Sequence, residues 1–302
     1  MNEEELEKYM RAGEIAARVK KEVLNLVRSG MKLLDIAEYV ENRITNLGGK
    51  PAFPCNLSLD NVAAHFTPEP IDTDLTIPEE SVLKIDLGVH VDGFIADTAV
   101  TVAFDPRNEI LVEAGRRVLE EALRAVKPGL SFYKFGGIIE DAAKSLGFNI
   151  VKNLSGHSLA QYRIHAGEVV PNCRDRLVMG SFREGRAYAI EPFVTRGIGL
   201  VTNGDRVTIY ALKPRGKLKK LSDAERRFYE QVLEERRTLP FTLRWYTSML
   251  RYEDGVSIVK KLAQRGLIVE YPVLVEVSSE PVAQFEETVV IYKGKVYVTT
   301  QT

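Results

Sequence analysis

The chain has 302 residues, of which 45% are hydrophobic, a composition typical of a globular protein with one large domain or two of ordinary size. Its 41 basic and 42 acidic residues leave a formal net charge of −1, so no global field favours nucleic acid or a membrane surface as a partner. Two cysteines, Cys55 and Cys173, make no disulfide framework, the acidic N-terminus is no signal peptide and no apolar run is long enough for a bilayer, so we predict a cytoplasmic protein with no membrane partner.

Two consecutive segments of the chain repeat the order helix, helix, extended stretch. Apolar residues recur with helical period in the predicted helices, which end at glycine-containing stops. The two segments also share a short string, since the tripeptide Asn-Leu-Ser occurs at residues 56–58 and again at residues 153–155. This pattern predicts an α+β fold with two related halves that face each other, and its helices lie at residues 3–28, 32–47, 109–126 and 131–146, the last capped by Ser131.

Residues 201–271 break this repeat. They contain a basic stretch, Lys213–Lys220, then a charged helix, and then a second helix, a glycine turn and a strand. We predict a helical, winged-helix-like insertion that divides the main domain into residues 1–200 and 272–302, with a last hairpin at Gly294. A solvated face is the expected role of the basic stretch, and contact with RNA or the ribosome is the alternative.

Residues 82–103 have the pattern of one β-hairpin that carries two acids. The Asp92-Gly93 pair is a two-residue turn signal between runs of β-branched and apolar residues. With that turn, alternation puts Asp86 and Asp97 on one face as diagonal neighbours, roughly 7–8 Å apart at the backbone. Two carboxylates side by side in a sheet are costly without a positive partner, so the hairpin predicts one bound cation or a pair.

Three residues from the rest of the chain complete a candidate metal site. His157 lies in Ser155–Ser158, which we expect to be a flexible polar turn, and Glu191 lies in an apolar, strand-like run. Alternation with Gln284 points Glu286 inward. A salt bridge is the alternative for any single acid, but four carboxylates and one imidazole favour a site for two divalent ions, Co, Mn, Fe or Zn. Such a pair activates water near neutral pH, so the residues predict a dinuclear metal hydrolase.

The ordered set of these five residues resembles the metal-binding set of the methionine aminopeptidases, which have the pseudo-twofold pita-bread metallopeptidase fold. Five local strings and the insertion are similar to the type 2 branch, and the resemblance runs from Lys8 onward. No charged N-terminal extension precedes it, so we expect the short, archaeal-like form. The strings are NVAAHFTP at 61–68, KIDLG at 84–88, GHSLAQYRIHAG at 156–167, AIEPF at 189–193 and AQFEET at 283–288.

The resemblance implies removal of the initiator methionine from nascent proteins and peptides by dinuclear-metal-assisted amide hydrolysis. It implies that Asp86 chelates one metal and that Asp97 and Glu286 bridge both. His157 and Glu191 would bind the other metal, and Glu191 would also accept the proton of the attacking water.

The resemblance also implies substrate-binding residues. His65 is expected near the substrate N-terminus and the scissile amide, and His165 is expected to donate a hydrogen bond to the scissile carbonyl oxygen. Phe53, Ile164 and Tyr271 are expected in an apolar pocket for the methionine side chain. Ile209 stands where some relatives carry a pocket histidine, and His90 receives no role.

Two alternatives remain open from the sequence. A proline-specific aminopeptidase or dipeptidase resembles this chain in fold and ligands but usually carries a separate N-terminal domain, whereas this chain begins with the first helix of the catalytic fold. A non-catalytic binding adaptor on the same fold has lost ligands, and all five are present here. Nascent polypeptide N-termini are the expected partners, the ribosome is a further one through the basic insertion, and we expect a monomer.

Overall fold

The computed structural model describes residues 1–213 and 221–301, so only Lys213 of the basic stretch Lys213–Lys220 falls among the described residues. The α-helices are α1 (Glu3–Leu26), α2 (Leu33–Asn46), α3 (Glu109–Ala125), α4 (Phe132–Ser145), α5 (Asp223–Arg236) and α6 (Tyr252–Gln264). Short 3₁₀ helices are η1 (Pro106–Asn108) and η2 (Leu243–Tyr246). In this part of the chain, no helix combines the length and the apolar character that crossing a membrane requires.

The strands form several small antiparallel sheets. Their orders are β1-β3-β4, β10-β11-β2, β12-β9-β5 and β14-β13-β8-β6-β7. The strands are β1 (Lys50–Leu59), β2 (Val62–Ala64), β3 (Val82–Val91), β4 (Phe94–Ala103), β5 (Asn149–Ile150), β6 (Ser155–Leu159), β7 (Val169–Pro171), β8 (Arg186–Ile190), β9 (Phe193–Thr195), β10 (Val201–Leu212), β11 (Ile268–Glu276), β12 (Val282–Gln284), β13 (Glu287–Tyr292) and β14 (Lys295–Val298).

The predicted hairpin at residues 82–103 is confirmed. Strands β3 and β4 pair along their whole length, with Asp86 opposite Ala99 and Asp97 opposite Gly88. Asp92 and Gly93 have φ angles of 51° and 87°, the pair of left-handed conformations that a type I′ turn requires. The diagonal placement of the two aspartates therefore follows from the turn.

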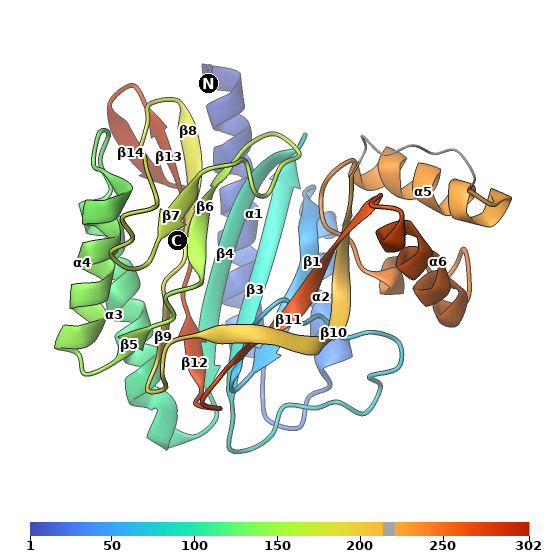
Figure 1. Cartoon of the computed structure of the whole chain (residues 1–302), viewed down its shortest axis with the longest axis horizontal. Coiled ribbons are helices and arrows are strands. Elements are labelled where there is room, and N and C mark those ends of the chain that lie inside the picture. The colour runs from blue at the N-terminus through green and yellow to red at the C-terminus, as the bar shows by residue number, and fades with distance from the viewer. Residues whose placement is uncertain (214–220, 302) are drawn as a thin grey trace.

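The repeated order of elements is also confirmed. Helices α1 and α2 accompany the β1-β3-β4 sheet, α3 and α4 accompany the second half, and α1 runs behind β4 in Figure 1. The side chain of Ser131 caps α4 by accepting a hydrogen bond from the Lys134 amide at 3.4 Å. One apolar cluster contains buried residues of α1, α2, α3 and α4, of the β1-β3-β4 sheet and of the five-stranded sheet. A backbone bridge between Ala99 and Glu286 joins the halves at their centre.

Residues 201–271, the predicted insertion, contain an apolar cluster of their own. Strands β10 and β11 pair with each other, and β11 also pairs with β2 of the first half. Between them, α5, η2 and α6 pack around a separate apolar cluster that includes Phe228, Phe241 and Leu262. Figure 1 shows α5 and α6 at the edge of the molecule opposite α3 and α4.

The turn expected at Ser155–Ser158 is wrong, because these residues open strand β6, which pairs with β7 and β8 inside the five-stranded sheet. Gly156 is needed there for space rather than for flexibility, since a Cβ would lie 2.2 Å from the Ala189 carbonyl oxygen. The segment is polar because it faces the cavity described below.

Candidate metal centre and its cavity

The five predicted metal-ligating residues line one cavity of about 360 Å³. They come from both halves of the fold, because Asp86 and Asp97 lie on β3 and β4, and His157 lies on β6. The His157 Nε2 atom is 3.3 Å from Glu191 Oε1 and 3.8 Å from Asp97 Oδ2. One ligand atom each from Asp97, His157 and Glu286 lie within 4.8 Å of one another, which is close enough for a shared cation.

The backbone around Asp97 and Glu286 holds the two halves in register. The Thr288 hydroxyl accepts a hydrogen bond from the Asp97 amide at 2.7 Å and donates one to the Asp97 carbonyl oxygen at 2.9 Å. Ala99 and Glu286 exchange backbone hydrogen bonds at 3.2 and 3.0 Å. Consequently, carboxylates from two distant segments face each other across an unbroken hydrogen-bonded seam.

Burial leaves the four acids with strongly altered ionisation. Asp97 and Glu286 are 3% and 1% exposed, whereas Asp86 keeps part of its surface open to the cavity. Burial raises the pKa of Asp86 to about 7. Burial, followed by repulsion from neighbouring acids, raises the pKa values of Asp97, Glu191 and Glu286 well above the usual range. The cluster therefore resists carrying four negative charges unless positive charge joins it.

The same cluster contains polar atoms with no hydrogen-bond partner among the described residues. One oxygen each of Asp86, Asp97 and Glu286 is buried and unpaired. Buried carboxylate oxygens without partners are costly, and metal coordination is a common way to satisfy them. Burial also lowers the pKa of His157 well below its ordinary value, which keeps the ring in the neutral form that binds metals.

Two further histidines border the predicted metal-ligating residues. His65 Nδ1 lies 3.2 Å from the Pro272 carbonyl oxygen, so the ring donates from Nδ1 and leaves Nε2 as an acceptor. Burial lowers the pKa of His65 to about 4, and burial also lowers the pKa of His165. The His165 ring packs edge-on against His157, with centroids 4.5 Å apart, and its centroid is 5.9 Å from that of Tyr271.

The predicted pocket residues Phe53, Ile164 and Tyr271 line the same cavity, and so does Ile209. Phe53 can lie flat on the hairpin because its partner in β3 is Gly88, where a Cβ would come within 2.3 Å of the ring. All ten predicted site residues therefore meet in one cavity, although their individual roles stay predictions. His90 does not line it, but accepts a hydrogen bond from the Gly93 amide.

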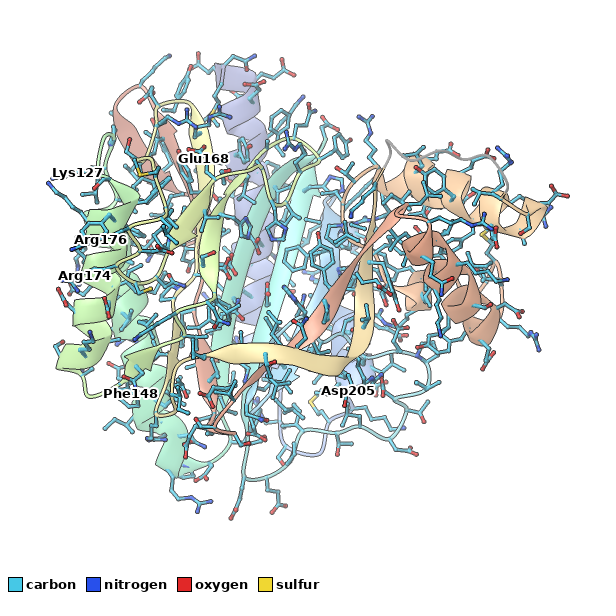
Figure 2. All side chains as sticks on the ribbon, in the orientation of Figure 1. Lys127, Phe148, Glu168, Arg174, Arg176 and Asp205 are labelled. Carbon is cyan, nitrogen blue, oxygen red and sulfur yellow. The ribbon has the colours of Figure 1, made fainter. Side chains whose placement is uncertain are left out.

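Sequence reasoning gave no site role to several other residues that line the cavity, among them Asn56, Glu168, Phe193 and Pro240. Phe193 had a usable signal, because it follows Glu191 by two positions and alternation puts both on one side. Glu168, labelled in Figure 2 beside β6 and β7, lies only three positions after His165, and this closeness to a predicted site residue was its one signal. Pro240 had none, because only the tertiary fold brings the insertion to the cavity.

The comparisons with known proteins agree with this geometry. The model of metallopeptidase family M24 matches residues 7–292. A protein of Thermococcus kodakarensis named methionine aminopeptidase is 42% identical over 297 residues, which are 98% of this chain and 100% of that protein.

Two solved structures share the fold. A thermophilic Arx1 has a TM-score of 0.87 at 20% identity, over 100% of this chain and 92% of its own. The methionine aminopeptidase of Thermotoga maritima has a TM-score of 0.72 at 22% identity, over 100% and 98% of the two chains. The expected α+β, pita-bread architecture is thereby confirmed.

Proposed function

Because the chain belongs to metallopeptidase family M24, we propose that it is a methionine aminopeptidase of the type 2 branch, a hydrolase that removes the N-terminal methionine from proteins and peptides. Relatives with that name match it over nearly the whole chain. The observation that carries the proposal is the convergence of four carboxylates and one neutral imidazole, from both halves of the fold, on one cavity.

The donor set fits divalent metal ions. Unpaired oxygens of Asp86, Asp97 and Glu286 are available as ligands, and the neutral ring of His157 adds a nitrogen. We propose that these four residues and Glu191 hold two ions of the Mn, Fe, Co or Zn kind, because four carboxylates balance the charge of two dications. When bound, such ions polarise the scissile carbonyl group and acidify water near neutral pH.

Glu191 is the proposed proton acceptor. Its carboxylate adjoins His157 at 3.3 Å and lies in the same buried cluster as Asp97, so both burial and neighbouring acids raise its pKa. From this position beside His157, the carboxylate can take a proton from the attacking water and return it to the leaving amine.

The two other histidines are proposed to bind the peptide. His165 is neutral, and a neutral imidazole donates through one nitrogen, so it can stabilise negative charge on the scissile carbonyl oxygen. His65 presents Nε2 as an acceptor and is suited to an N–H of the substrate near the scissile amide. Its φ of 66° is uncommon for a residue other than glycine, and such strain is often found at functional sites.

The apolar wall is proposed to take the methionine side chain. Phe53, Ile164 and Tyr271 line the cavity that holds the metal-ligating set, so a side chain bound against them leaves the first peptide bond beside Glu191 and His165. A cavity of about 360 Å³ suits one side chain and its flanking peptide group.

The test compares the cleavage of Met-Ala-Ser and Ala-Pro-type peptides by the protein loaded with Mn²⁺ or Co²⁺. We expect methionine release from the first peptide only. Cleavage of the proline peptide alone would favour a proline-specific peptidase, and metal binding without cleavage of either peptide would favour a binding adaptor.

Three finer points stay predictions. Ribosome contact is proposed through Lys213–Lys220, of which residues 214–220 lie outside the described residues. The insertion at 201–271 is proposed as a separate subdomain, supported by its own apolar cluster. A cytoplasmic monomer is the expected state.

A further inference from the structure

The segment that leaves helix α5 contacts residues next to two walls of the cavity, Ala52 beside Phe53 and Tyr162 near Ile164. Arg236 is the last residue of α5, and Arg237 follows with a φ of 54°, a conformation that bulky residues seldom adopt. This abrupt change of direction lets neighbouring side chains reach different parts of the main domain. Pro240, four residues after Arg236, lines the cavity itself.

Arg236 holds the strand that carries Phe53. Its Nη2 donates to the carbonyl oxygens of Pro51, Ala52 and Pro240 at 2.8, 3.1 and 3.0 Å. The residue is only 7% exposed, and its Nη2 hydrogen bonds all go to carbonyl oxygens. Removing a charged guanidinium from water costs free energy that hydrogen bonds to carbonyl groups only partly offset. We therefore attribute the presence of Arg236 to the backbone segments that it holds together.

Arg237 and Thr238 hold the turn that precedes Ile164 and His165. The Arg237 guanidinium lies 4.1 Å from the centre of the Tyr162 ring, and the Thr238 hydroxyl donates to the Tyr162 carbonyl oxygen. From the other side, the Tyr162 amide donates to the Gly93 carbonyl oxygen at 2.8 Å. Tyr162 is thus fixed between the insertion and the tip of the β3-β4 hairpin, two residues before a cavity-lining side chain.

We propose that residues 236–240, the positioning segment, set the distance between the Phe53 and Ile164 walls and thereby the fit of the methionine side chain. This proposal rests on the proposed function. Arg236 and Thr238 touch neither the metal-ligating residues nor the cavity, so they act as positioning residues. Loosening the Phe53 wall weakens the binding of the methionine side chain more than it changes the chemistry, because the proposed metal-ligating residues are held by a different seam.

The first experiment replaces Arg236 with Met, which keeps most of the volume and removes every donor. Wild-type protein loaded with Mn²⁺ is first assayed on Met-Ala-Ser. If the wild type does not cleave this peptide, the proposed function is wrong, and that result is distinct from a failure of the positioning role. For Arg236→Met we expect KM to rise by about tenfold, kcat to change by less than about threefold, and the preference for Met-Ala-Ser over Leu-Ala-Ser to fall by about tenfold. Arg236→Lys, which retains a donor, should recover part of the loss.

Two controls separate positioning from a general loss of structure. Arg227→Met changes an exposed arginine of the same helix and should leave KM and the peptide preference unchanged. Trp245, the only tryptophan, has its ring centre 4.8 Å from the Arg236 guanidinium, so its fluorescence should change in Arg236→Met but not in the control. A changed emission with wild-type KM and preference would show a merely structural contact and overturn the proposal.

A second variant keeps the test decisive if Arg236→Met does not fold. Thr238→Val removes one hydroxyl at constant shape, so the Tyr162 turn loses its tie to the insertion. We expect the same pattern of raised KM and reduced preference, together with weaker binding of free L-methionine by calorimetry on the Mn²⁺-loaded protein. Wild-type values in all three measurements would overturn the proposal.

Discussion

At the residue scale, Asp97 is the point where the two halves of the site meet. Its backbone is tied to Thr288 in both directions, and its carboxylate faces His157 and Glu286 from the other half. The tie fixes the backbone independently of the carboxylate. Removing the side chain should therefore disturb the chemistry far more than the fold.

We predict that Asp97→Ala loses at least about 1,000-fold in kcat/KM and binds divalent metal weakly, because it removes a proposed shared ligand. Circular dichroism should remain that of the wild type. Asp92→Asn, in the exposed turn of the same hairpin, is the matched control and should retain activity. Full activity in Asp97→Ala would contradict the proposed ligand set.

Glu286 and Glu287 are adjacent in the chain, and their side chains point in opposite directions. Glu286 faces the cavity, whereas Glu287 pairs with Lys20 of α1, with Oε1 and Nζ 2.6 Å apart. Lys20 also donates to the Thr98 hydroxyl at 2.8 Å. The alternation predicted from the sequence is confirmed, and both acids are buried for different reasons.

We predict that Glu287→Gln lowers the free energy of unfolding by about 3 kcal/mol, since it leaves a largely buried ammonium without its anion. Urea denaturation measures this. Glu80→Gln, which breaks the exposed pair with Arg107, should cost less than about 0.5 kcal/mol. Equal losses in the two variants would mean that burial of the pair is unimportant.

At the scale of elements, residues 201–271, the proposed insertion, are joined to the rest of the chain by buried polar contacts as well as by apolar packing. Glu41 of α2 accepts hydrogen bonds from Arg244 at 2.6 Å and from the Trp245 indole at 2.7 Å. Glu69, between β2 and β3, accepts one from the Thr242 hydroxyl at 2.5 Å. These contacts hold η2, which follows the positioning segment in the chain, against α2 and the β2–β3 connection.

The Glu69 contact gives a pH-dependent prediction. Burial raises the pKa of Glu69 from 4.5 to about 7, so its contribution to stability is fully present below pH 4.5 and is lost as the pH rises to about 7. The loss amounts to about 3 kcal/mol. In Glu69→Gln this part of the decline should disappear from urea unfolding measured between pH 4.5 and 7.5, whereas Glu79→Gln, at an exposed position on the same connection, should keep it. An unchanged decline in Glu69→Gln would contradict the assignment.

At the scale of the whole molecule, the cavity lies between two halves that share one apolar cluster and one backbone seam. Buried acids from both halves repel one another there, and divalent cations should relieve that repulsion. Metal binding is thus expected to stabilise the entire fold and not only the site.

We predict that Mn²⁺ at about 100 times its Kd stabilises the protein by about 2.7 kcal/mol, which raises the Tm by roughly 5 °C, and that EDTA reverses the shift. Differential scanning calorimetry measures both. Asp97→Ala should show little of this shift. Equal Tm values with Mn²⁺ and with EDTA would count against a metal site between the halves.

The sequence by itself determined the helices, the hairpin and the five residues, proposed as metal ligands, that line the cavity. Local signals were sufficient for these, because the Asp92-Gly93 turn fixes the register of Asp86 and Asp97, and alternation orients Glu286. The tertiary structure decided that Ser155–Ser158 form a strand, because these residues pair with β7 and β8. The β8 backbone leaves room only for glycine at position 156. It also decided that Pro240 lines the cavity and that Arg236 bonds to the strand of Phe53, since these contacts join segments far apart in the chain. Such contacts have no periodicity that a sequence can display.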